Sequence, residues 1–95
     1  MTRYLSLLRF TEAGGRAIKK STARAAAFRK AAEEAGVKVE AQYWTVGAYD
    51  GVIVLRADEE KKVLRCLTDL AAGGYVRTDT LRAFDAEQFG AMVGK

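Results

Sequence analysis

The fold of this 95-residue chain is decided by residues 42–56, which read QYWTVGAYDGVIVLR. Within this stretch, Gly47-Ala48-Tyr49-Asp50 is typical of a tight turn, because glycine adopts a positive φ and aspartate bonds backbone amides. The segment after the turn, Val52 to Leu55, is apolar at four successive positions. A strand of that composition is expected to be covered on both faces. The stretch therefore predicts a hairpin whose second arm is a central strand.

The segments on either side of this hairpin predict the order β-α-β-β-α-β, followed by a short terminal helix. The predicted strands are residues 4–10, 37–46, 51–56 and 76–83, and the predicted helices are residues 21–35, 58–72 and 86–93. Residues 11–20 predict a short irregular or helical turn, because Gly14 and Gly15 weaken a helix there by roughly 1 kcal/mol each. Helix caps are predicted at Ser21 or Thr22, at Asp58, and at Asp85 with a Gln88 capping box.

Side-chain periodicity assigns faces to two of these elements. Alternation along residues 37–46 places Val39, Ala41 and Tyr43 on one face of an edge or half-covered strand. In the helix over residues 21–35, the apolar residues repeat at helical spacing, which leaves Arg24 facing water. The many alanines of this helix predict a close approach to the sheet.

With right-handed crossovers, this order predicts one ferredoxin-like α+β domain over residues 1–95, with residues 4–10 and 51–56 as central strands. Helices then cover only one face of the sheet. The other face exposes half of Val52–Leu55 together with either Leu5 and Leu7 or the opposite side of residues 4–10. Such a patch is too apolar for a soluble monomer. We therefore expect a homodimer, or a higher even-numbered oligomer, in which two such faces pair across a two-fold axis.

Three blocks of sequence resemble the GYD-domain family. They are GAYD at residues 47–50 with the apolar strand after it, YLSLLRFT at residues 4–11, and VRTDTLRAF at residues 76–84. The resemblance covers nearly the whole chain and implies a ferredoxin-like, dimeric α/β-barrel protein of bacterial or archaeal type. It implies no particular activity and brings no catalytic residues with it.

The residue types that are missing narrow the possible functions. The chain has no histidine, which removes the commonest general base, the commonest metal ligand and the usual haem axial ligand. Cys66 is the single cysteine, so no intramolecular disulfide forms, and it is expected to be a packing residue. No apolar run approaches the roughly 18 residues of a membrane span, and the first residues predict a strand rather than a signal peptide. We expect a cytoplasmic protein with no metal and no cofactor.

The net charge of +4 is unevenly distributed, because residues 1–40 hold nine Lys and Arg against four Glu. A basic half can bind nucleic acid or an acidic partner, or can simply be a solvated helix face, which we favour. RNA-recognition modules of this strand order stack bases on aromatic side chains of the sheet. Residues 51–56 carry none, so nucleic-acid binding is disfavoured. The Gly14-Gly15-Arg16 segment lacks the spacing of a phosphate-binding loop.

A polar ligand site is predicted from aromatic, arginine and aspartate side chains near the hairpin and the last strand. The candidates are Tyr4, Tyr43, Trp44, Tyr49, Asp50, Arg77 and Asp79. In a cavity, an Arg–Asp pair with a tyrosine suits a carboxylate or an enolate-like ligand. The alternative interpretation is turn chemistry at residues 49–50, with an edge strand kept soluble by charge, or intersubunit salt bridges, at residues 77–82.

The sequence thus favours a small homodimeric module that binds a small molecule or takes part in protein assembly. The alternative is a cofactor-free enzyme, similar to a monooxygenase or isomerase, that acts on a small aromatic or polyketide-like substrate. That alternative rests on analogy of fold alone. A third class is an amino-acid-sensing regulatory module. An enclosed pocket touching Tyr49 or Arg77 favours the enzyme or the sensor.

Overall fold

Four antiparallel strands form one sheet in the order β2-β3-β1-β4 in the computed structural model, which describes residues 1–94. The strands are β1 (Thr2–Phe10), β2 (Lys38–Trp44), β3 (Gly51–Ala57) and β4 (Val76–Ala83). The pairs β2–β3, β3–β1 and β1–β4 are all antiparallel. This order places β1 and β3 in the centre and confirms the predicted ferredoxin-like α+β arrangement.

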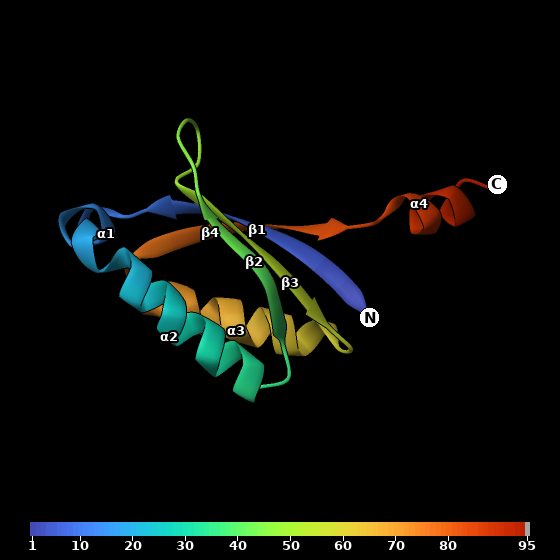
Figure 1. Cartoon of the computed structure of the whole chain (residues 1–95), viewed down its shortest axis with the longest axis horizontal. Coiled ribbons are helices and arrows are strands. Elements are labelled where there is room, and N and C mark those ends of the chain that lie inside the picture. Colours follow the sequence, from blue (N-terminus) through green and yellow to red (C-terminus); the bar gives the residue numbers. More distant parts are fainter. Residues whose placement is uncertain (95) are drawn as a thin grey trace.

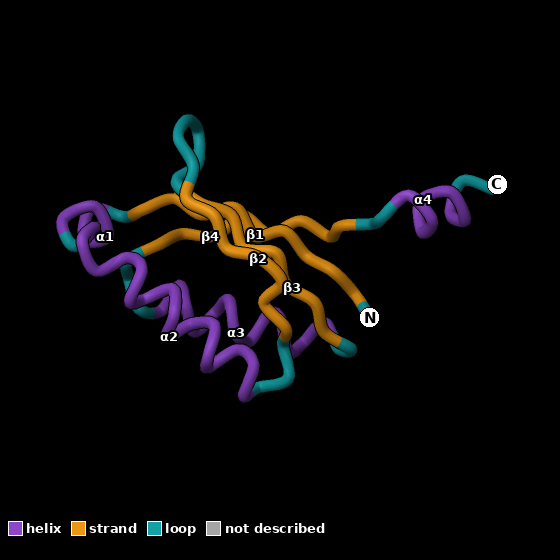
Figure 2. The backbone as a smooth tube through the Cα atoms, viewed as in Figure 1, coloured by secondary structure: helices purple, strands orange, loops and turns teal. Residues whose placement is uncertain are grey.

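Both long helices lie on the same face of the sheet (Figures 1 and 2). The helical segments are α1 (Glu12–Arg16), the 3-10 turn η1 (Ile18–Lys20), α2 (Ser21–Glu34), α3 (Glu60–Ala72) and α4 (Ala86–Met92). Figure 1 shows α2 and α3 beneath the sheet and α4 well away from it, beyond the end of β4. The opposite face of the sheet, which we call the open face, is covered by no helix within residues 1–94.

The core lies between the sheet and the two long helices. Ile53 and Leu55 of β3 point into it, and Leu55 is completely buried. They pack with Val63 and Leu67 of α3 and with Ala32 of α2. The small side chain at Ala32, 1% exposed, lets α2 approach the sheet closely at its C-terminal end. Alternation on β3 therefore assigns Ile53 and Leu55 to the core and Val52 and Val54 to the open face.

A β-bulge between Val39 and Ala41 makes the predicted face assignment of β2 wrong. Val39 pairs with Leu55 and is buried under the helices, whereas Ala41 pairs with Val54 on the open face. The extra residue reverses the alternation from that point onward. Tyr43 therefore lies on the open face, whereas the face beneath the helices carries Gln42 and Trp44.

Two of the three predicted helix caps are also wrong. α2 follows directly from η1 with Lys20 at its N-cap and no side-chain cap, and Ser21 Oγ instead accepts a hydrogen bond from Trp44 Nε1 at 2.9 Å. At α3 the N-cap is Glu59, also without a side-chain bond, because the carboxylate of Asp58 accepts from Lys62 Nζ at 3.1 Å. At the start of both helices, the predicted capping side chain therefore bonds another side chain instead of the backbone N–H groups of the helix.

The capping box at the start of α4 is confirmed. Asp85 Oδ1 accepts from Gln88 N at 2.8 Å, and Gln88 Oε1 accepts from Asp85 N at 2.9 Å. This helix does not require a tertiary contact to begin at Ala86, because its first free N–H groups are satisfied locally.

Candidate functional site

The open face has an apolar centre made by the two central strands. Leu5 and Leu7 of β1 pair with Val54 and Val52 of β3, and all four side chains are half-buried. Leu81 of β4 pairs with Leu5 and is 48% exposed. The sequence allowed either side of β1 to lie on the open face. The structure places Leu5 and Leu7 on the open face. The side chains of Tyr4, Ser6 and Leu8 point toward the helices. The patch is contiguous, which distinguishes it from scattered surface apolar residues.

Paired charges border this patch at the end where β1 begins. Arg3 Nε donates to Glu40 Oε1 at 2.7 Å, and Arg56 Nη1 lies 3.6 Å from Glu40 Oε2. The hydrogen bond from Arg3 and its charge hold the pKa of the Glu40 carboxyl below its ordinary value, although partial burial opposes this. The same bond raises the pKa of Arg3. Glu40, the residue at the bulge, thus pairs with both cations beside the apolar patch and offsets one of their two positive charges.

The hairpin loop borders the other end of the patch. The Tyr49 hydroxyl donates to Asp79 Oδ2 at 3.1 Å, and the guanidinium of Arg9 lies 4.7 Å above the Tyr49 ring. Arg9 Nε also donates to the carbonyl of Ala48 at 3.2 Å. Two of the predicted site residues, Tyr49 and Asp79, are therefore brought together, whereas Arg77 pairs across the sheet with Arg9. This cluster ties the loop to the sheet and lies on the surface rather than in a cavity.

Asp50 fastens the hairpin to the central strand β1. Its Oδ2 accepts from Phe10 N at 2.8 Å, its own N–H donates to Leu8 O at 2.8 Å, and its carbonyl accepts from Thr45 N at 2.9 Å. Gly47 adopts the positive φ, +129°, expected at the turn. The Asp50 carboxylate therefore satisfies the last backbone N–H of β1, at the point where that strand leaves the sheet.

Replacing Asp50 by alanine is expected to lower the free energy of unfolding by about 1–3 kcal/mol, because a part-buried N–H at Phe10 loses its acceptor. Urea denaturation at a fixed protein concentration measures this loss. The matched control is Asp79→Ala, an exposed carboxylate in the same cluster, for which a change within about 0.5 kcal/mol is expected. An Asp50→Ala protein as stable as the parent would contradict the role assigned to the carboxylate.

The remaining predicted site residues do not join the Tyr49–Asp79 pair. Tyr4 is 4% exposed beneath the helices, where its hydroxyl donates to Glu60 Oε2 at 3.1 Å. Burial, and then this hydrogen bond, raise the pKa of Tyr4. Tyr43, 61% exposed, lies at the edge of the open face, and Trp44 lies against the start of α2. No shared constellation of the seven side chains exists within residues 1–94.

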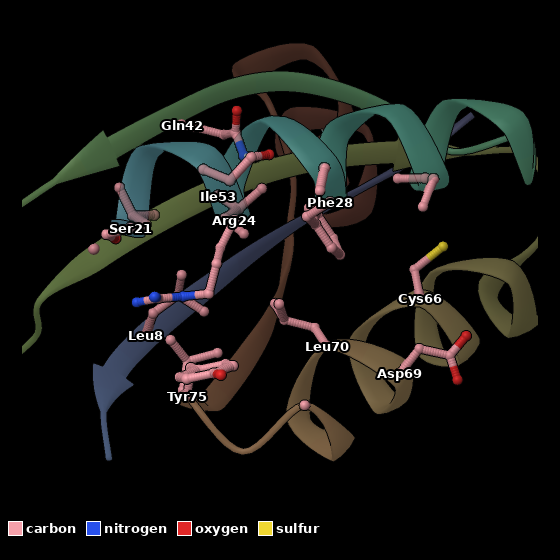
Figure 3. A pocket seen from close by; sticks show the side chains of 18 of the residues that line it. Leu8, Ser21, Arg24, Phe28, Gln42, Ile53, Cys66, Asp69, Leu70 and Tyr75 are labelled. Carbon is pink, nitrogen blue, oxygen red and sulfur yellow. The ribbon is translucent and has the colours of Figure 1, made fainter. Parts of the chain in front are cut away.

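A cavity with a volume of about 870 Å³ lies between α2, α3 and the sheet (Figure 3). Leu8 and Ile53 form part of its floor, Phe28 and Leu70 line its two helical sides, and Arg24 reaches into it. Its walls include Tyr43, Trp44 and Asp50 but neither Tyr49 nor Arg77. We call this cavity the α2/α3 cleft.

Sequence reasoning missed the main cleft residues. The prediction that Arg24 faces water is wrong, because its Nη1 donates to Ala17 O at 2.9 Å and its guanidinium lies 4.4 Å from the Tyr75 ring. The many alanines of α2 were interpreted only as a sign of close helix–sheet packing, although they also indicate space beside the helix. Ala25, Ala27, Ala31 and Ala35 all line the cleft, where their small side chains leave space between the helices.

The helix α4 has no partner surface within the described chain. It does not pack on the sheet or on the two long helices (Figure 1). Phe84, Phe89, Met92 and Val93 are between 39% and 59% exposed. A helix of seven residues is not stable alone in water, and within residues 1–94 no apolar surface packs against these side chains. We call residues 84–94 the C-terminal arm.

These features define a ferredoxin-like α+β protein with an uncovered apolar sheet face and a projecting arm. Among residues 1–94 there is no cluster of three or more metal-ligating side chains. In the same part of the chain, no helix has the length and apolar character needed to cross a membrane.

The chain belongs to the GYD domain family, whose model matches residues 4–93, which confirms the resemblance carried by its three sequence blocks. It is 34% identical over 84 residues to a Thermus thermophilus protein named glutamine synthetase and cystathionine beta-lyase binding protein. That match covers 87% of this chain and 88% of the relative. The crystal structure of TTHA0845, also from Thermus thermophilus, is similar with a TM-score of 0.57 and 27% identity, over 90% of this chain and 96% of the other.

Proposed function

We propose that this protein is a homodimeric binding module that docks onto a metabolic enzyme. The observation that carries the proposal is the uncovered apolar centre of the open face, formed by Leu5, Leu7, Val52 and Val54. In a two-fold dimer the same patch serves both subunits, so apolar side chains meet apolar side chains. The paired charges around Glu40 and Asp79 remain at the rim, where water keeps them solvated.

The size of the sheet indicates that the arm belongs to the same interface. Four strands spaced about 4.8 Å apart, each about seven residues long at roughly 3.3 Å per residue, give a footprint on the order of 450 Å². Stable interfaces bury about 800 Å² on each partner. The C-terminal arm, which leaves the sheet from the end of β4, supplies additional apolar area when it packs on the second subunit.

The surface left outside in such a dimer is the helical layer, and its N-terminal part is basic. Arg16, Lys19 and Lys20 are exposed around η1, and Arg29 and Lys30 are exposed on α2. A patch of one charge sign attracts a partner of the opposite sign and speeds their encounter. The relative named for binding glutamine synthetase and cystathionine beta-lyase supports an enzyme of that kind as the partner.

The protein is expected to form a complex with the glutamine synthetase or the cystathionine beta-lyase of its own host, with an affinity that falls as salt is added. Size-exclusion co-elution of purified components detects the complex, and isothermal titration calorimetry at several salt concentrations measures its affinity. The double reversal Lys19→Glu/Lys20→Glu is expected to weaken binding at least about tenfold without changing the oligomeric state.

Bovine serum albumin, an acidic protein unrelated to either enzyme, is the control for attraction by charge alone. Binding to albumin as strong as to the enzymes would contradict a specific partner, and so would the absence of a complex with both enzymes.

A further inference from the structure

We propose that the α2/α3 cleft binds a small carboxylic acid with an apolar body, and that Arg24 holds its carboxylate. The cleft lies on the face of the sheet opposite the proposed dimer interface. The inference therefore goes beyond the proposed function and does not depend on it.

The cleft has the size and lining of a small-molecule site. Its volume of about 870 Å³ lies within the range of roughly 300–1,000 Å³ typical of ligand pockets. Leu8, Phe28, Ile53 and Leu70 give it a mainly apolar interior (Figure 3). A cavity of this kind is filled best by a ligand whose bulk is hydrocarbon, since apolar surface is removed from water on both sides.

Arg24 supplies a polar anchor for the ligand. Its Nη1 is bonded to the carbonyl of Ala17 and its guanidinium is stacked on Tyr75, so the side chain is held in one position. Its Nη2 is buried and has no hydrogen-bond partner. Arg24 also takes part in no ion pair within residues 1–94. A buried donor without an acceptor destabilises the protein, and more so when the donor is charged.

A carboxylate is the acceptor that matches this geometry, because charge-assisted hydrogen bonds to guanidinium are short and strong. Because Nη2 is buried, a ligand reaches it only when a neighbouring side chain moves aside. The Tyr75 ring stacks on the guanidinium and belongs to a residue that is 40% exposed, so we infer that this ring moves. The backbone of Tyr75 stays in place through the bond from Thr11 N to its carbonyl at 3.0 Å.

Charged groups of both signs line the cleft. They are Arg24, Lys61, Lys62 and Arg65 against Asp50 and Asp69. Lys61 and Lys62 form ion pairs with Glu59 and Asp58 beside the cleft, so Arg24 and Arg65 stand against the carboxylates of Asp50 and Asp69. Burial raises the pKa of the Cys66 thiol, so this wall residue stays neutral at physiological pH. Recognition of a carboxylate in the cleft therefore rests on Arg24 itself rather than on an excess of positive charge along the walls.

The probes that test this proposal are octanoate and 1-octanol, which share a hydrocarbon chain and differ in the carboxylate. Isothermal titration calorimetry of the full chain is expected to show octanoate binding at least tenfold more tightly than 1-octanol. The Arg24→Gln protein is expected to lose that tenfold preference while keeping its affinity for 1-octanol. Lys30→Gln, which removes the same charge from an exposed position of α2 outside the cleft, is expected to leave octanoate binding unchanged.

Two further measurements locate the site. Ala31→Leu fills the cleft from an exposed position of α2 and is expected to weaken both ligands at least tenfold while circular dichroism stays unchanged. Amide chemical shifts on octanoate addition are expected to change along residues 24–28 and 66–75 and to stay constant around Leu81, which lies on the open face. Equal affinity of the two probes, equal losses in Arg24→Gln and Lys30→Gln, shifts confined to the open face, or no binding would each overturn the proposal.

Discussion

Replacing Val54 by lysine is expected to convert the proposed homodimer into a monomer. Val54 lies at the middle of the open face, between Leu5 on β1 and Ala41 on β2. In the paired dimer, two lysine side chains would be placed in a dry interface close to the symmetry axis. The penalty for burying an uncompensated charge is several kcal/mol per ion. The dissociation constant should therefore rise at least about 1,000-fold, since each tenfold change corresponds to about 1.4 kcal/mol.

Light scattering coupled to size exclusion, at micromolar protein, measures this effect. The Val54→Lys monomer should remain folded, because the side chain points away from the core that Ile53 and Leu55 occupy. The matched control is Leu64→Lys, which introduces the same charge at a 50% exposed leucine on α3 and should leave the dimer intact. A dimer that survives Val54→Lys, or a control that dissociates equally, would contradict pairing through the open face.

Removing residues 85–95 is expected to weaken the dimer at least about 100-fold while leaving the fold of each subunit intact. The apolar side chains of α4 do not contact the sheet or the long helices of their own chain, so their loss should not loosen the core. Burying one large apolar side chain contributes about 1.5–3 kcal/mol, and the removed segment carries Phe89, Met92 and Val93. Two arms are lost per dimer, which makes the expected effect large.

Analytical ultracentrifugation gives the dissociation constant, and urea denaturation of the dissociated protein gives the stability of the subunit. Phe89→Asp in the full chain should reproduce most of the weakening, whereas Phe89→Leu should retain most of the affinity. If the truncated protein dimerises as tightly as the parent, the arm has no place in the interface. If the isolated subunit itself loses stability, the arm packs on its own chain instead.

Much of the fold could be predicted from the sequence because its signals are local. The four-residue apolar run in β3, the turn at Gly47 and the capping box at Asp85 each depend on neighbours within a few positions. The strand order followed from these elements and from the handedness of crossovers. The bulge at Glu40 could not be predicted in this way, because the alternation of residues 37–43 continues unbroken through it.

The candidate site was predictable only in part, because it depends on how elements meet. An uncovered apolar face was expected from half of Val52–Leu55, but which half it is, and which side of β1 shares it, depend on how the sheet packs on the helices and on the register with β3. Tyr49 reaches Asp79 only because the hairpin loop folds over the end of the sheet. Arg24 appears solvent-facing on a helical projection, and its contact with Tyr75 arises from residues 51 positions apart in the sequence.

Sedimentation equilibrium of the unmodified protein over a range of micromolar concentrations tests the central claim most directly. One chain has a mass of 10.4 kDa, and pairing of the open faces predicts a species of twice that mass that persists at the lowest concentration measured. A mass of a single chain at every concentration would contradict the paired sheets. The apolar centre at Leu5, Leu7, Val52 and Val54 would then have to be buried by a different partner.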